Sequence, residues 1–270
     1  SATLSAPTTA ERVRSACVRA DGAILAADGV PPAGTAVHHL LPDGSFALTV
    51  PGHSAVAAAA GAADANGVPA VLELTDYAPL PLREPVRSLV WVRGQVHGVP
   101  PASVRALLDL IAADHPNPAL LGVGTEHDLV LLGVDSIVVA DAGGAEPVGV
   151  TDLLAARPDP FCELESAWLR HLDSDHPEVI ARLAGKLPAM LRRGEVRPLG
   201  LDRYGVRLRV EGVDGGEGVA EVAVGECEVR HGLRGSYALN PARPKPAGCC
   251  ACPCGLRQWA TRRGREARRC

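Results

Sequence analysis

The sequence predicts an α+β protein, with an antiparallel split β-barrel followed by a small α/β domain of two helices and a hairpin. About the first 150 residues contain short strand patterns and two or three helices, without the regular strand–helix alternation of a doubly wound sheet. Two prolines within residues 157–160 then interrupt helix and strand alike. The segment 163–211 predicts helix, polar break, helix and hairpin.

Composition and charge limit the classes of function. The chain has 270 residues, 47% of them hydrophobic but only 3% aromatic, so we expect a core of Ala, Val and Leu. The net charge is −4, and residues 241–270 alone carry +7, which leaves −11 on the remainder. An acidic body of this kind argues against a nucleic-acid-binding surface.

Location and redox state are predicted from what the sequence lacks. No run of 18 apolar residues occurs, so no membrane-spanning segment is expected, and the first residues show no secretory signal pattern. Of eight cysteines, five lie in the last 22 residues, and Cys17, Cys162 and Cys227 stand alone in the body. This spacing is typical of free thiols and predicts a cytoplasmic protein.

The barrel elements are predicted by hydrophobic periodicity. We expect strands at 46–50, 68–75 and 88–97, helices at 11–20, 54–63 and 103–113, and a hairpin formed by 128–134 and 136–141. Gly94 interrupts the third strand and predicts a β-bulge or a barrel corner. Ser103 has the chemistry of a helix N-cap.

The second domain is predicted from helix-capping and turn chemistry. Apolar residues one turn apart predict a helix beginning near residue 163. A second helix begins at Pro177, with Ser174 or Asp175 as the expected cap. Residues 202–205 predict a hairpin turn, and the alternation of apolar residues with arginine over 206–210 predicts one buried and one solvated sheet face.

Several short matches place the chain beside a known family. They are Pro158-Asp-Pro160 followed by Glu165, His171-Leu, Asp175-His176, Leu201-Asp-Arg-Tyr-Gly-Val206, and REPVR at 83–87 with the strand 88–94. On these residues the second domain resembles the small α/β domain appended to split barrels in the HugZ-like haem-utilisation family. Those barrels are similar to pyridoxamine-phosphate-oxidase and flavin-reductase barrels.

The resemblance implies both an organisation and a function. It implies a split barrel at 1–156 and the small α/β domain at 157–235. Residues 236–270 depart from the family, whose members usually end in an apolar strand and helix, and their Pro-, Cys- and Arg-rich composition predicts a disordered tail. The resemblance also implies a homodimer with a haem or FMN site near the interface between the barrels. The expected activity is oxidative haem degradation or flavin-linked reduction. The alternative is a non-catalytic haem-binding or adaptor protein that has lost the catalytic site.

Three histidines are candidate cofactor ligands. His171 and His176 lie with Asp173 and Asp175 in the polar break, where an imidazole backed by a carboxylate would contact haem or a metal. The alternative is a capped turn between helices, in which the same residue types bond the backbone. In the resemblance, haem-degrading members use a C-terminal histidine as iron ligand, and the matching candidate here is His231.

Three arginines are candidate anion-binding residues. Arg83, Arg87 and Arg93 would bind a flavin phosphate or haem propionates through paired hydrogen bonds, or else they are solvated side chains of a strand face. His38 and His39 precede a strand, and a surface role is expected for them. The tail motif at 249–254 contains a CxxC without a partner pair, so a disordered tail is expected there and no metal site is predicted.

Overall fold

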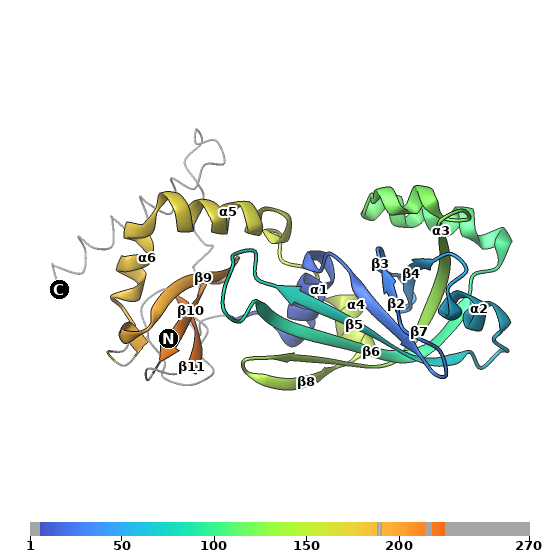
Figure 1. Cartoon of the computed structure of the whole chain (residues 1–270), viewed down its shortest axis with the longest axis horizontal. Coiled ribbons are helices and arrows are strands. Elements are labelled where there is room, and N and C mark those ends of the chain that lie inside the picture. The colour runs from blue at the N-terminus through green and yellow to red at the C-terminus, as the bar shows by residue number, and fades with distance from the viewer. Residues whose placement is uncertain (1–5, 188, 190, 214–217, 225–270) are drawn as a thin grey trace. The chain divides into compact units, whose positions relative to one another are not determined.

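The computed structural model describes residues 6–187, 189, 191–213 and 218–224, which fall into two compact units (Figure 1). The barrel unit comprises residues 8–76 and 88–158. The appended unit comprises residues 6–7, Tyr77–Arg87 and the described residues from Asp159 onward. The connection between two strands of the large sheet therefore belongs to the appended unit, which the sequence did not predict.

The barrel unit is built on one curled sheet. Its strands are β1 (Ala23–Ala27), β2 (Ala33–Thr35), β3 (His38–Leu40), β4 (Phe46–Pro51), β5 (Val68–Tyr77), β6 (Val86–Gly98), β7 (His127–Asp141) and β8 (Gly144–Val148). The strand order is β2-β1-β5-β6-β7-β4-β3, and β8 also pairs with β7. The pairs β1–β2, β1–β5, β3–β4, β4–β7, β6–β7 and β7–β8 are antiparallel.

The two ends of this sheet are neighbours in the sequence. Strands β2 and β3 stand at opposite ends of the order, yet only Ala36 and Val37 separate them. The backbone of Val37 bonds to Thr49 of β4, donating to its Oγ1 at 3.0 Å and accepting from its N–H at 3.0 Å. The sheet must curl for such a short connection to join its ends. The α+β class with an antiparallel split barrel is thus confirmed.

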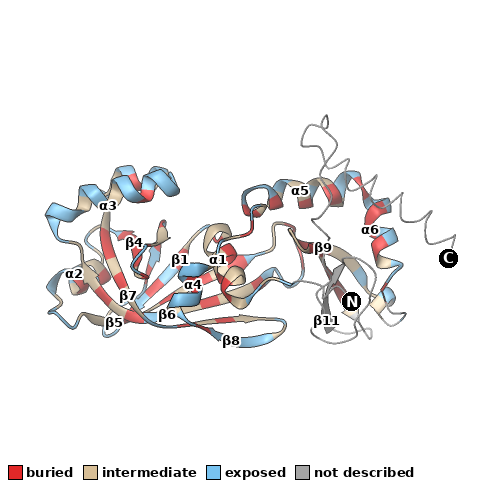
Figure 2. Cartoon of the chain, turned by 180° about the vertical axis from the view of Figure 1, so that it is seen from behind, coloured by how far each residue is buried: buried red, intermediate tan, exposed pale blue. Residues whose placement is uncertain are grey.

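Small aliphatic side chains fill the barrel core, as the composition predicts. Phe46 is the one aromatic residue in this cluster among the described residues. Helix α1 (Thr9–Arg19) contributes Val13, and α4 (Val150–Ala155) contributes Leu153. Figure 2 shows the buried stripe on these helices and strands. A core without large rings depends on many small contacts.

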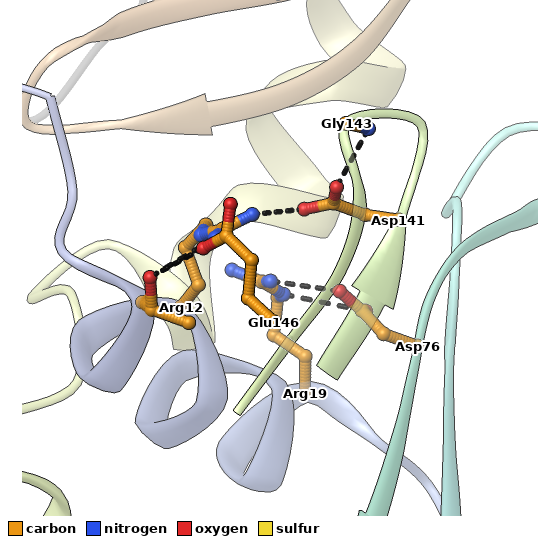
Figure 3. Close-up of polar contacts among 7 residues, drawn as sticks. Arg12, Arg19, Asp76, Asp141, Gly143 and Glu146 are labelled. Carbon is orange, nitrogen blue, oxygen red and sulfur yellow. Dashed lines mark hydrogen bonds and ion pairs between the residues drawn. The ribbon is translucent and has the colours of Figure 1, made fainter. Parts of the chain in front are cut away.

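Helix α1 is also held by ion pairs, which Figure 3 shows. Arg12 pairs with Asp141 of β7, and with Glu146 of β8 at 2.7 Å. Two turns further on, Arg19 pairs at 2.7 Å with the buried Asp76 of β5. These contacts fix the helix to three strands of the same unit.

The remaining helices of the barrel unit are α2 (Ala55–Ala62), capped by Ser54, and α3 (Pro101–Asp114), followed by the short η1 (Pro118–Gly122). The expected Ser103 cap is wrong. Pro100 occupies the cap position without a side-chain bond, because Pro101 at the first helical position starts the helix earlier. None of the described helices has the length and apolar composition that a membrane crossing requires.

The expected hairpin over 128–141 is also wrong, since these residues form the single strand β7. The polar residues that predicted a turn form a bulge instead. Arg93 pairs with Ser136 and Gly94 with Val134, so Asp135 has no partner in the register. The bulge expected at Gly94 is confirmed, and the true hairpin joins β7 to β8.

The appended unit places two helices against a three-stranded sheet. The helices are α5 (Cys162–Asp175) and α6 (Pro177–Ala184); a short η2 (Leu191–Arg193) follows, then β9 (Glu195–Asp202), β10 (Gly205–Val213) and β11 (Gly218–Val224). The strand order is β11-β10-β9, antiparallel throughout. Apolar residues of both helices pack on Leu201, Val206 and Leu208. The hairpin predicted at 202–205 is confirmed.

The second face of this sheet is covered rather than solvated. Arg209 and Glu211 of β10 are buried, and Leu199 of β9 packs against Leu80 and Leu82. The segment Tyr77–Arg87 provides this cover within the unit. The predicted solvated face is therefore wrong, because a segment distant in sequence lies on it.

Candidate functional site

Two histidines meet at the junction between α5 and α6. His171 lies in the last turns of α5, and His176 is the single residue between the helices, with φ −132° and ψ 46°. Proline disfavours helical geometry in the residue before it, so Pro177 keeps His176 out of both helices. The two Nε2 atoms lie 3.2 Å apart, and the rings meet edge to face with centroids 4.8 Å apart.

Each of these rings has a carboxylate near its other nitrogen. Asp175 contacts Nδ1 of His171, whereas Glu178 Oε1 lies 3.5 Å from Nδ1 of His176, which has no hydrogen-bond partner in the described part of the chain. The contact with Asp175 favours the His171 tautomer that carries its proton on Nδ1. The side chain of His171 is 33% exposed and that of His176 is 11% exposed, so the pair is accessible from one side.

The helix cap expected from Ser174 or Asp175 is absent. Ser174 Oγ donates to the Arg170 carbonyl at 2.8 Å, and no side chain caps α6. Asp175 is directed to His171 instead, because the two residues lie one helical turn apart. Asp173 accepts a 3.0 Å bond from Arg197 of β9 and raises the pKa of that guanidinium.

Arg87 is bound inside the appended unit. Its Nη1 donates to Glu165 Oε1 at 2.9 Å and to the Leu199 carbonyl at 3.2 Å. The same carboxylate oxygen accepts from the Leu201 N–H at 2.8 Å. Arg87 and Glu165 are 3% and 1% exposed. A structural role for Arg87 is thus directly visible, and its expected cofactor role stays a prediction.

Of the other expected cofactor residues, Arg83 lies in the appended unit and Arg93 in the barrel unit. Arg83 is exposed, and its backbone N–H donates to Glu211 Oε1 at 2.9 Å. Arg93 is an exposed residue of β6 in the barrel unit. His231 lies outside the described residues. The cofactor-binding roles of these residues also stay predictions.

His38 and His39 have the contacts of structural residues. His38 Nε2 donates to the Cys17 carbonyl at 2.9 Å, and burial lowers the pKa of both imidazoles. Burial also raises the pKa of the Cys17 thiol to about 12, which makes it a poor nucleophile. His39 Nε2 lies 3.7 Å from Asp114.

Sequence reasoning missed Glu178 as a neighbour of the histidine pair. Its signal is present in the sequence, since Glu178 lies in the first turn of the helix that Pro177 begins. In the sequence, Glu165 is marked only as one of the residues that carry the family resemblance. Its buried partner, Arg87, is far away in sequence and gave no local signal.

Comparisons with known proteins found similarity at the level of structure. No protein-family model matches the chain, and no curated protein sequence matches it. The haem-binding protein from Mycobacterium smegmatis shares 20% identity with a TM-score of 0.53, over 98% of this chain and 100% of that chain. At this identity the likeness shows a shared fold.

Two more distant structures were also found. A protein of unknown function from Agrobacterium tumefaciens str. C58 is 18% identical over 75% of this chain and 84% of its own, with a TM-score of 0.38. The FAD- and haem-binding protein from Mycobacterium smegmatis is 17% identical over 53% of this chain and 83% of its own, with a TM-score of 0.34.

Proposed function

We propose that this protein binds haem. The observation that carries the proposal is its fold, which it shares along nearly its whole length with the haem-binding protein from Mycobacterium smegmatis. The resemblance of the appended domain to the haem-utilisation family supports the same ligand. Fold alone does not determine function, so the proposal depends on residues that fit the ligand.

His171 is the described residue that best fits an axial iron ligand. Asp175 contacts its Nδ1, which leaves Nε2 available as a donor atom, and the side chain is partly exposed. Haem would supply redox-active iron, and the protein would supply the ligand and its orientation.

The ring of His176 stands in the way of that role in the observed arrangement. Its Nε2 lies 3.2 Å from Nε2 of His171, so the flat macrocycle would overlap it. Haem binding at His171 therefore requires the His176 ring to rotate away.

The arginines would hold the haem carboxylates. Arg83 is exposed on the segment Tyr77–Arg87, and Arg93 is exposed on β6. Guanidinium groups bind carboxylates through paired hydrogen bonds, which suits propionates. Arg87 would first have to leave Glu165, so we assign a propionate to Arg83, which belongs to the same unit as His171. The cofactor role of Arg93, in the barrel unit, stays a prediction.

Titration of the full chain with haemin tests the proposal. A saturable Soret shift is expected in the wild type and in the control His115→Ala, which alters an exposed histidine of the barrel unit. His171→Ala should lose the shift, while His176→Ala should keep or strengthen it, because the obstructing ring is gone. His231→Ala tests the other ligand candidate. A Soret shift retained in both His171→Ala and His231→Ala would contradict these ligand assignments.

Two further measurements refine the proposal. Adding a reductant to the haem complex separates the alternatives of the sequence analysis, since oxidative degradation bleaches the Soret band and a non-catalytic adaptor retains it. Saturable quenching of FMN fluorescence, without a haemin response, would favour the flavin.

We also propose a homodimer, supported by the resemblance, and sedimentation velocity with and without haemin tests it.

A further inference from the structure

We infer that His171 and His176 form a binding site for one divalent transition-metal cation, with Zn²⁺ or Cu²⁺ as the ions of matching chemistry. This inference goes beyond haem binding and does not depend on it. It rests on the convergence of two like atoms, the Nε2 nitrogens, at 3.2 Å.

The tautomers of the two rings can suit a shared cation. Asp175 contacts Nδ1 of His171, which places that ring's proton on Nδ1 and leaves a lone pair on Nε2. Nδ1 of His176 has no hydrogen-bond partner among the described residues, and Glu178 Oε1 lies 3.5 Å from it. In the metal-free protein the 3.2 Å contact is a hydrogen bond between the two Nε2 atoms. A cation would replace the proton of that bond, the His176 proton would move to Nδ1 beside Glu178, and both Nε2 lone pairs would ligate.

The separation of the two nitrogens fits metal ligation. Histidine nitrogens lie about 2.0–2.1 Å from zinc, so two ligands at a tetrahedral angle lie about 3.3 Å apart. The observed 3.2 Å is close to this value. The edge-to-face rings, with an interplanar angle of 85°, allow both lone pairs to be directed toward one point.

The ligand type selects the class of metal. Imidazole suits zinc, copper and nickel, whereas magnesium and calcium prefer oxygen ligands. Among the described residues no group of three or more His, Cys, Asp or Glu side chains could hold a metal, so water would complete the coordination. We therefore expect weaker binding than in a four-ligand structural zinc site.

The surroundings favour a cation. Asp175 and Glu178 bring two carboxylates to the far sides of the rings, where they increase ligand basicity and offset the charge of the metal. The exposed flank of His171 admits the ion and its waters.

Calorimetric titration of the full chain with Zn²⁺ at neutral pH tests the inference. The accessible thiols are first alkylated with iodoacetamide in every sample, so that they do not compete for the metal. One site per chain is expected in the wild type and in the control His115→Ala. His171→Ala and His176→Ala should each weaken binding by at least about tenfold, and Asp175→Asn by about tenfold through its effect on the His171 ring.

A spectroscopic measurement on the wild type tests the inference without depending on how well the variants fold. The electron paramagnetic resonance spectrum of the Cu²⁺-loaded wild type should show nitrogen coupling from two imidazoles, and binding should weaken in acid because only neutral imidazole ligates. Coupling from fewer than two nitrogens overturns the inference. So does the absence of a saturable site, or a site retained in both histidine variants. His176→Ala separates the two proposals, because it should weaken zinc binding by at least about tenfold but preserve the haemin response.

Discussion

Replacing Arg87 with alanine should destabilise the appended unit strongly. Arg87 and Glu165 are almost fully buried, at 3% and 1% exposure, and their 2.9 Å contact is reinforced by the N–H of Leu201. The substitution leaves the Glu165 carboxylate in the interior without its cation. Removing one partner of a buried pair costs about 3–5 kcal/mol in the free energy of unfolding, because the remaining charge is uncompensated.

A matched control comes from an exposed pair in the same chain. Arg105 and Asp109 of α3 pair at 3.1 Å, but their side chains are 86% and 64% exposed. An exposed pair one helical turn apart contributes about 0.3–0.5 kcal/mol. Arg105→Ala should therefore lower the free energy of unfolding by only about a tenth as much as Arg87→Ala.

The assay is urea unfolding, monitored by tryptophan fluorescence and by circular dichroism. Trp168, which packs against the core of the appended unit, contributes to the fluorescence signal. The double variant Arg87→Met/Glu165→Leu should recover most of the loss, since apolar residues of similar volume replace buried pairs at little cost. A free energy of unfolding for Arg87→Ala within about 0.5 kcal/mol of the wild-type value would contradict this predicted loss.

Three further predictions concern the barrel unit. Gly94→Ala should lower the free energy of unfolding by about 3 kcal/mol or more, because a Cβ at this position overlaps the Gly133 carbonyl. Gly34→Ala is the control and should be tolerated, since nothing lies within 4 Å of its added Cβ. Urea unfolding midpoints check both variants. Burial lowers the pKa of His38 below its ordinary 6.5, so its contribution to stability is present above about pH 6.5 and falls as the pH drops further. Urea midpoints at about pH 7.5 and 5.5 should differ less in His38→Gln, and an equal difference would contradict this. Cys17, with its pKa raised to about 12, should resist iodoacetamide in the native protein at about pH 8, as peptide mass spectrometry would show; rapid labelling would contradict the assigned burial.

Local chemistry made part of the fold predictable. Helix α1 begins where Thr8 and Glu11 form a capping box, and the bulge at Gly94 follows from a glycine inside a strand pattern. The hairpin at 202–205 is likewise determined by its turn residues. Such signals lie within a few residues of the element that they specify.

Long-range contacts made the rest unpredictable from one sequence. Strand β1 is rich in alanine and has no local signal, since its pairing with β5 joins residues about 50 positions apart. The residues around Asp135 have turn chemistry, yet pairing with β6 keeps them in a strand. Arg209 follows a solvated pattern but is buried beneath Tyr77–Arg87.

The candidate site shows the same division. The density of titratable residues at 171–176 drew attention to the junction, and Pro177 predicted the break between the helices. The orientation of each ring could not be predicted, because it depends on the conformation of His176 and on contacts with Asp175 and Glu178.

The absorption spectrum of the intact protein, purified from cells supplied with haem, tests the central claim most directly. We predict a Soret band corresponding to one haem per chain, which survives in His176→Ala and disappears in His171→Ala. A colourless preparation that also gives no Soret shift with added haemin would contradict haem binding, and a yellow preparation with a flavin spectrum would favour FMN instead.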